Sequence, residues 1–146
     1  MSLNYEDCIE RGLLRKIPSS KDKAGRSITK AQKWLEEAKK TFESKAYNSS
    51  VSAAYLTMFH AARSILFWEG WREKSHACVA RYLEQYVQKG KLEQKWVDLF
   101  DHVREMRHEE QYDLGFFATK EEAEKSIDSA AWFLPRMESL LETIGS

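Results

Sequence analysis

The chain has 146 residues, a length that one domain with its own hydrophobic core can account for. Hydrophobic residues make up 42% of it and charged residues 32%, which excludes an intrinsically disordered composition. Lysine plus arginine equals aspartate plus glutamate at 23 each, so a protein-wide basic field for nucleic acid is also excluded and any phosphate site must be local.

The first 26 residues are predicted to form an extension, made of one helix and one loop, on a core bundle that covers 27–142. The helix is expected over 3–16. The segment PSSKDKAGRS, residues 18–27, is rich in serine, glycine and charge and predicts a mobile loop. Because the start of the chain is acidic and lacks an apolar stretch, we do not expect a signal peptide there. The apolar side of the first helix would consist of Leu3, Ile9, Leu13 and Leu14.

The next two predicted helices carry the strongest apolar periodicity. One begins near Thr29, where TKAQ forms a capping-box pattern with Gln32. The other covers about 48–68 and ends at Gly70. The core positions of the former are Ala31, Trp34, Leu35, Ala38 and Phe42. The core positions of the latter are Val51, Ala54, Tyr55, Met58, Ala62, Ile65 and Leu66.

Three further helices complete the prediction. Ser75 is the expected N-cap of HACVARYLEQYVQK, with a glycine following it at position 90, and another helix covers about 92–109. The last helix begins at Thr119 with the capping box TKEE and continues to about 141, with a kink or an end near Phe133 because Pro135 lies inside it. The pattern therefore predicts a single all-α domain, an antiparallel up-and-down bundle of five to six helices.

The two cysteines and the most apolar stretch bear on the compartment. Cys8 and Cys78 lie far apart in no metal-binding spacing, so we expect both to be reduced and buried. The stretch AAYLTMFHAARSILFW is interrupted by His60 and Arg63 and is too short to cross a bilayer. We therefore expect a protein of the cytoplasm that does not enter the membrane.

The segment REMRHEEQYD, residues 104–113, holds the main candidate site. Arg104, His108 and Tyr112 follow one another at i+4 spacing, and Arg107 lies beside them, so the four can converge on one ligand. Arginine forks suit phosphate oxygens, histidine can transfer a proton near neutral pH, and a tyrosine hydroxyl can orient a phosphate. Metal-independent RNA cleavage requires groups of these kinds.

A structural interpretation of the same segment stays open. Four acidic residues surround the arginines and can form ordinary salt bridges with them. Of these, Glu110 would point to the apolar side of a regular helix, so either the helix ends near 109 or a cation holds this carboxylate. The acidic neighbours are Glu105, Glu109, Glu110 and Asp113.

Other histidines and tryptophans are interpreted structurally, with one exception. His60 is expected at the core or its boundary, and His76 at a capped helix start. Trp132 is expected in the core, whereas Trp71 is expected to be exposed and to mark a partner contact. No phosphate-loop, dinucleotide-binding or zinc-protease motif is present, so neither a metal nor another cofactor is expected.

Several stretches of the chain together resemble the HEPN domain, a small helical family of bacteria and archaea with relatives in larger eukaryotic proteins. The resemblance covers about residues 27–142, and a longer N-terminal version of the family covers the whole chain. The matching stretches are AQKWLEEAKKTFESKAYNSSVSAAYLTMFHAARSILFWEGWREKSHACVARYLEQYV, REMRHEEQYD and EEAEKSIDSAAWFL. The residues that match family patterns within the first stretch are Tyr55, Phe59, His60, Ala61, Ala62, Arg63, Ser75 and His76.

The resemblance implies a five- or six-helix bundle that forms a homodimer. Many members are encoded beside a minimal nucleotidyltransferase in toxin–antitoxin-like pairs. Some are metal-independent endoribonucleases with an arginine, four to six residues and then a histidine, and their sites meet across the dimer. Here Arg104 and His108 are separated by only three residues, and Arg107 has Tyr112 where that register requires histidine.

Three hypotheses follow. The first is a component of such a pair that binds a nucleotide, RNA phosphate or the nucleotidyltransferase partner through Arg104, Arg107 and Tyr112. The second is an endoribonuclease toxin in which Arg104 binds phosphate and His108 acts as acid or base. The third is a purely structural dimerising protein. The altered spacing favours ligand binding over catalysis.

Overall fold

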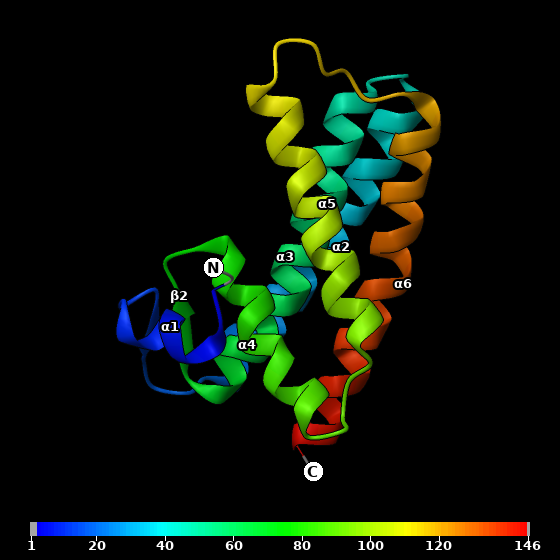
Figure 1. The fold of residues 1–146 in the computed structure, drawn as a ribbon. Helices are drawn as coiled ribbons and strands as arrows, with labels where there is room; N and C mark the ends of the chain where they lie inside the picture. The colour runs from blue at the N-terminus through cyan, green and yellow to red at the C-terminus, as the bar shows by residue number, and fades with distance from the viewer. Residues whose placement is uncertain (1–2, 146) are drawn as a thin grey trace.

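The computed structural model describes residues 3–145 and is dominated by helices, in agreement with the predicted all-α bundle (Figure 1). Four long helices form the body, and a small ribbon of two strands joins the N-terminal extension to it. The elements are α1 Tyr5–Glu10, β1 Leu14–Lys16, α2 Lys21–Glu43, α3 Tyr47–Glu69, β2 Trp71–Glu73, α4 His76–Gln88, α5 Gln94–Tyr112 and α6 Lys120–Gly145.

Helix α3 is the central element, because α2, α4, α5 and α6 all pack against it. Every residue of its predicted stripe is fully buried, and so are Ser50, Thr57 and Ser64 of the same helix. The hydroxyls of Thr57 and Ser64 donate to α3's own carbonyls, so these polar groups enter the core without losing a hydrogen bond. Gly70 ends the helix in a left-handed conformation, as predicted.

The prediction of one helix over 3–16 is wrong. Helix α1 ends at Glu10, and Gly12, with φ of 69°, turns the chain into a short strand. That strand pairs antiparallel with β2, with Leu14 opposite Glu73. Leu14 is buried under this ribbon, so the pairing with a segment almost sixty positions away overrides the local helical pattern.

The predicted loop over 18–27 and the predicted helix start at Thr29 are also wrong. Helix α2 begins at Lys21, and the Ser20 hydroxyl accepts a hydrogen bond from the Lys23 amide at 3.1 Å. Serine and charge here reflect a capped helix with an exposed face. Its other face is buried, and the Ser27 hydroxyl donates to the His60 carbonyl at 2.6 Å.

The cysteines are joined and not reduced. Cys8 of α1 and Cys78 of α4 are both fully buried and form a disulfide. Seventy positions separate them, so spacing alone carried no sign of the pairing. The bond ties the N-terminal extension to α4, beside which α1 lies in Figure 1.

The last helix follows its predicted start but not its predicted end. Thr119 and Glu122 form the capping box, with reciprocal hydrogen bonds of 3.0 and 3.1 Å. Helix α6 continues past Pro135 to Gly145, so an end near Phe133 is wrong. The Pro135 ring lies on the exposed side, while Phe133 and Met137 are buried and hold both halves to the core. No helix within 3–145 is long and apolar enough to cross a membrane.

Two tryptophans lie opposite to their predictions. Trp71 is half-buried in β2, with the Lys16 ammonium 4.9 Å from its ring centroid. Trp132, predicted for the core, is 64% exposed on α6. The strand pairing that covers Trp71 could not be recognised from helical periodicity. On α6, Phe133 takes the core position, and its neighbour Trp132 points to solvent.

Candidate functional site

The two arginines of REMRHEEQYD lie on the side of α5 that faces α3 and α4. Both are partly buried. Arg104 is 3.4 Å from a carboxylate oxygen of Asp101, which also accepts from Arg81 of α4. The Arg107 guanidinium lies over the ring of Tyr55, 5.2 Å from its centroid. Arg107 forms no ion pair with any residue in the described part of the chain.

Tyr55 connects these arginines to His76. Its hydroxyl oxygen is 2.8 Å from Nδ1 of His76, and the histidine ring stacks on Phe59 with centroids 4.2 Å apart. His76 itself stays exposed at the start of α4. Partial desolvation lowers the pKa of His76, and the charges of Arg107, Arg63 and Arg104 lower it further. The group therefore presents a neutral imidazole beside two cations at pH 7.

His108 and Tyr112 form the outer part of the predicted arc. Their ring centroids are 4.7 Å apart, and both side chains are exposed, Tyr112 by 71%. The predicted four-residue arc is thus divided into an inner pair, Arg104 and Arg107, which faces α3 and α4, and an outer pair in solvent. We call the inner pair with Tyr55 and His76 the arginine site.

The sequence left two explanations for Glu110: that the helix ends near 109, or that a cation holds its carboxylate. Helix α5 continues to Tyr112, so an end near 109 is wrong. The carboxylate is partly buried against α3, where the Ser52 hydroxyl donates to it at 3.3 Å. Burial raises the pKa of Glu110, and the Ser52 hydrogen bond and the Arg107 charge oppose that rise. The Arg107 charge acts on this carboxylate, but the two side chains form no ion pair.

A largely buried ion pair lies further along α3. Nε of Arg63 is 2.6 Å from Oε1 of Glu73, and the guanidinium lies over the rings of Phe59 and Phe67 at 5.6 and 4.9 Å. Burial raises the pKa of Glu73, while Arg63 opposes this change. The pair fixes β2 against α3 and holds an arginine near the site described above.

The residue-by-residue interpretation missed Tyr55 and His76. Tyr55 has core spacing, and it is indeed fully buried, but its hydroxyl reaches the surface group His76. The sequence pattern explains His76 by helix capping, whereas Ser75 takes the N-cap position and makes no side-chain cap hydrogen bond. The signal that could have found them was the pair of stretches YLTMFHAAR and KSH, which lie far apart in sequence and meet here.

Comparison with known proteins places this chain in a family. The HEPN domain matches residues 24–140. Two proteins of Methanocaldococcus jannaschii are similar: "Putative toxin MJ0605", 31% identical over 78% of this chain and 85% of its own, and "Putative toxin MJ0142", 28% identical over 78% of each. A "UPF0332 protein" of Archaeoglobus fulgidus is 45% identical over 34% of this chain and 39% of its own. The chain therefore belongs to the HEPN domain family.

The arrangement is chemically suited to an anion. A guanidinium that stacks on an aromatic ring keeps its in-plane N–H donors available to an oxygen ligand. Within 3–145 there is no group of His, Cys, Asp and Glu that could hold a metal ion. The residues present can bind phosphate and move a proton.

Proposed function

We propose that this HEPN protein is the ligand-binding component of a toxin–antitoxin-like pair, and that it binds the phosphate of a nucleotide or RNA through Arg104 and Arg107. The observation that carries the proposal is the Arg107 guanidinium, which lies over Tyr55 and forms no ion pair within 3–145. A partly buried cation that forms no ion pair is costly, and an anionic ligand bound directly to it would offset that cost.

His108 and Tyr112 belong to the proposed site as its outer edge. They follow Arg104 by four and eight positions on the same helix, so a phosphate on the arginines would lie near the exposed histidine and tyrosine rings. Tyr112 would stack on a base or orient the phosphate. The names of the two Methanocaldococcus relatives support a toxin-related role, and the family resemblance supports a nucleotidyltransferase as partner.

A nucleotide-dependent rise in melting temperature tests the binding proposal. Adenosine monophosphate should raise the melting temperature of the wild type but not of Arg107→Gln. Arg11→Gln removes an exposed arginine outside the site and serves as the matched control. If Arg107→Gln and wild type respond equally, the arginine site does not bind the nucleotide.

Endoribonuclease activity is the second candidate function, and the exposed imidazole of His108 on the arginine side of α5 favours it. Histidine could move the 2′-hydroxyl proton while Arg104 stabilises charge on the phosphorus oxygens. Cleavage of a generic RNA in EDTA that disappears in His108→Ala would establish it. Binding without cleavage would leave the ligand-binding function alone.

A homodimer is part of the proposal as well. The segment after α5 exposes Leu114 completely and Phe117 by 77%, two and five positions after the exposed Tyr112. Exposed apolar side chains gathered on one segment are suited to a contact with a second copy, which would bring another arginine site beside the first. Light scattering should give about twice 17.1 kDa, and Leu114→Ser with Phe117→Ser should give the monomer mass. If the wild type is monomeric and still binds the nucleotide, the homodimer is excluded and the site lies within one chain.

A further inference from the structure

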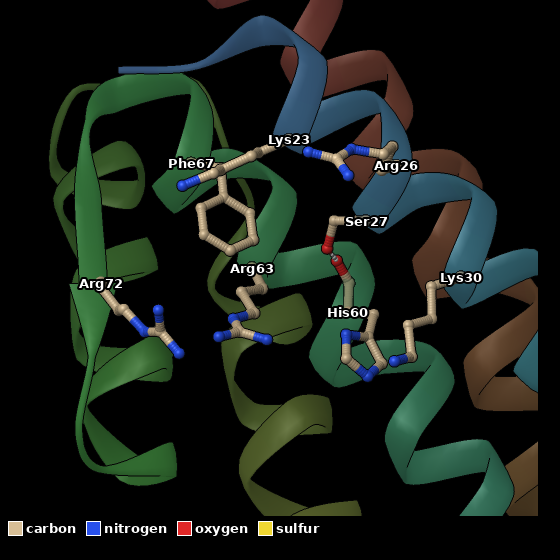
Figure 2. Close-up of a pocket in the computed structure, with 8 residues that line it drawn as sticks. All are labelled: Lys23, Arg26, Ser27, Lys30, His60, Arg63, Phe67 and Arg72. Carbon is tan, nitrogen blue, oxygen red and sulfur yellow. Dashed lines mark hydrogen bonds between the residues drawn. The ribbon is translucent and has the colours of Figure 1, made fainter. Parts of the chain in front are cut away.

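A second basic site lies further along α3 from the arginine site, where α2, α3 and β2 line an open recess of about 270 Å³ (Figure 2). Figure 2 shows Arg63 at the middle of the lining, with Arg72 on one side and His60 and Lys30 on the other. The other lining residues are Lys23, Arg26, Ser27 and Phe67. We call this recess the α2–α3 pocket.

The pocket carries an excess of positive charge although the whole chain is neutral. Arg63 is paired with Glu73, and Arg26 forms an exposed pair with Asp22 at 2.9 Å. Lys23, Lys30 and Arg72 form no ion pair within 3–145. Because no carboxylate of the described residues lines the pocket, these three cations face a recess that favours an anion.

The base of the pocket is formed by side chains that packing holds in place, while Lys23, Lys30 and Arg72 stand exposed at its rim. His60 and Ser27 are only 8% and 6% exposed, and the Ser27 hydroxyl fixes α2 to the carbonyl of His60. Arg63 is held between two aromatic rings and its ion pair with Glu73. Since Glu73 takes one side of that fork, the remaining N–H donors are available to the pocket.

The pocket and the arginine site are linked by ring contacts. The Phe59 ring stacks on His76 with centroids 4.2 Å apart, and its centroid is 5.2 Å from that of the His60 ring. Arg107 and Arg63 are therefore connected through the buried rings of Tyr55 and Phe59 and through His76, the one exposed ring of the three. Tyr55 and Arg63 are eight positions apart on α3, which corresponds to about 12 Å along the axis. A single phosphate cannot cover that distance, but a short nucleotide chain can.

We infer that the α2–α3 pocket is a second phosphate subsite, and that the ligand of this protein is a single-stranded oligonucleotide whose phosphates bind at Arg107 and at Lys30 and Arg72, with the exposed His76 ring between them. This inference rests on the proposed function of the arginine site. Cations that follow a strand, with rings between them for the bases, are the usual arrangement for single-stranded nucleic acid.

Fluorescence anisotropy with two probes tests the inference: labelled adenosine monophosphate and a labelled single-stranded RNA of about eight nucleotides. The variant Lys30→Gln/Arg72→Gln should weaken RNA binding roughly ten-fold and reduce the salt dependence by about 0.7 for each phosphate that it no longer binds. Its binding of the mononucleotide should equal that of the wild type. The matched control is Lys39→Gln/Arg11→Gln, which removes one exposed lysine of α2 and one exposed arginine of the extension. Arg107→Gln should abolish binding of the mononucleotide and weaken binding of the RNA.

Each other outcome separates the two proposals. If the pocket variant binds RNA like the wild type while Arg107→Gln does not, the second subsite is overturned and the proposed function stands. If the pocket and control variants lose RNA affinity equally, only net charge matters, and the subsite is overturned. If the pocket variant also loses the mononucleotide, the pocket is not an extension of the arginine site. If Arg107→Gln binds the mononucleotide normally, the proposed function itself fails. Matching melting temperatures of all variants exclude misfolding.

Discussion

At the scale of single residues, Arg107 lies over the Tyr55 ring and forms no ion pair within 3–145. Its acidic neighbours suggested salt bridges, but Glu110 is held by Ser52, and Asp101 binds Arg104 and Arg81. The guanidinium is left with the Tyr55 ring, an arrangement that keeps the charge in place and its donors free. The sequence could predict the arginine. It could not predict how the acids would be distributed.

The site residues on α5 could be identified from the sequence, but not those that contact them from α3 and α4. Spacing along α5 identified Arg104, Arg107, His108 and Tyr112, because residues on one helix follow a known period. Tyr55 and His76 come from α3 and α4, and only tertiary packing brings their rings to α5. No local pattern carries that information.

His60 gives a pH-dependent prediction. Burial lowers its pKa to about 4, with Lys30 and Arg63 contributing, whereas an unfolded chain has the ordinary value of 6.5. As the pH falls below 6.5, the unfolded chain takes up this proton and the folded protein does not. Between pH 7 and pH 5 the folded state should therefore lose about 2 kcal/mol through this group.

The variant His60→Gln supplies the comparison for that prediction. Other titrating groups, including Glu73 and His76, remain in both proteins, so their contributions cancel in the difference. Urea unfolding at pH 7 and pH 5 should show a smaller loss in the variant than in the wild type. Equal losses in both proteins would mean that His60 keeps its ordinary pKa in the fold.

At the scale of elements, the long helices followed from periodicity and the N-terminal extension did not. Helix α3 was predicted within one residue of its bounds because its buried stripe and its terminal glycine agree. The extension is fixed instead by strand pairing with β2 and by the disulfide to α4. Both constraints join segments distant in sequence, so the local pattern of serine and charge predicts a loop where α2 already begins.

Gly70 ends α3 at the point where the segment after β1 passes close to it. It has φ of +89°, and a Cβ there would lie 2.7 Å from the Ile17 carbonyl oxygen. Gly70→Ala should lower the free energy of unfolding by about 3 kcal/mol, from left-handed strain and the displaced strand together. Chemical denaturation measures this loss.

Gly12 is the matched control, because its φ is +69° but nothing lies within 4 Å of an added Cβ. Gly12→Ala should cost only the conformational part, about 1 kcal/mol. Similar losses in the two variants would show that the approach of Ile17 to Gly70 contributes nothing to stability.

At the scale of the whole molecule, the Cys8–Cys78 disulfide closes the extension onto the bundle. The loop that it closes has a sequence separation of 70, for which the chain-entropy model gives about 4 kcal/mol of stabilisation. Reducing agent should therefore shift the urea midpoint of the wild type to a lower concentration. The variant Cys8→Ala/Cys78→Ala should already lie at the lower midpoint and should not respond to reductant. Superimposed wild-type curves with and without reductant would contradict this prediction.

The whole molecule also explains how a chain with no net charge can be proposed to bind phosphate. Its acids and bases are equal in number but not evenly mixed: the arginine site and the α2–α3 pocket face neighbouring parts of α3, and neither has a carboxylate for every cation within 3–145. Composition excluded a basic field, and it could not exclude a local one.

The most direct measurement of the central claim is calorimetric titration of adenosine monophosphate into wild type, Arg107→Lys and Arg107→Gln. Lysine keeps the charge but loses the planar fork over Tyr55. We predict saturable binding by the wild type, weaker binding by Arg107→Lys and none by Arg107→Gln, with Arg11→Gln equal to the wild type. Equal binding by wild type and Arg107→Gln would contradict the account, because the phosphate would then bind somewhere other than the arginine site.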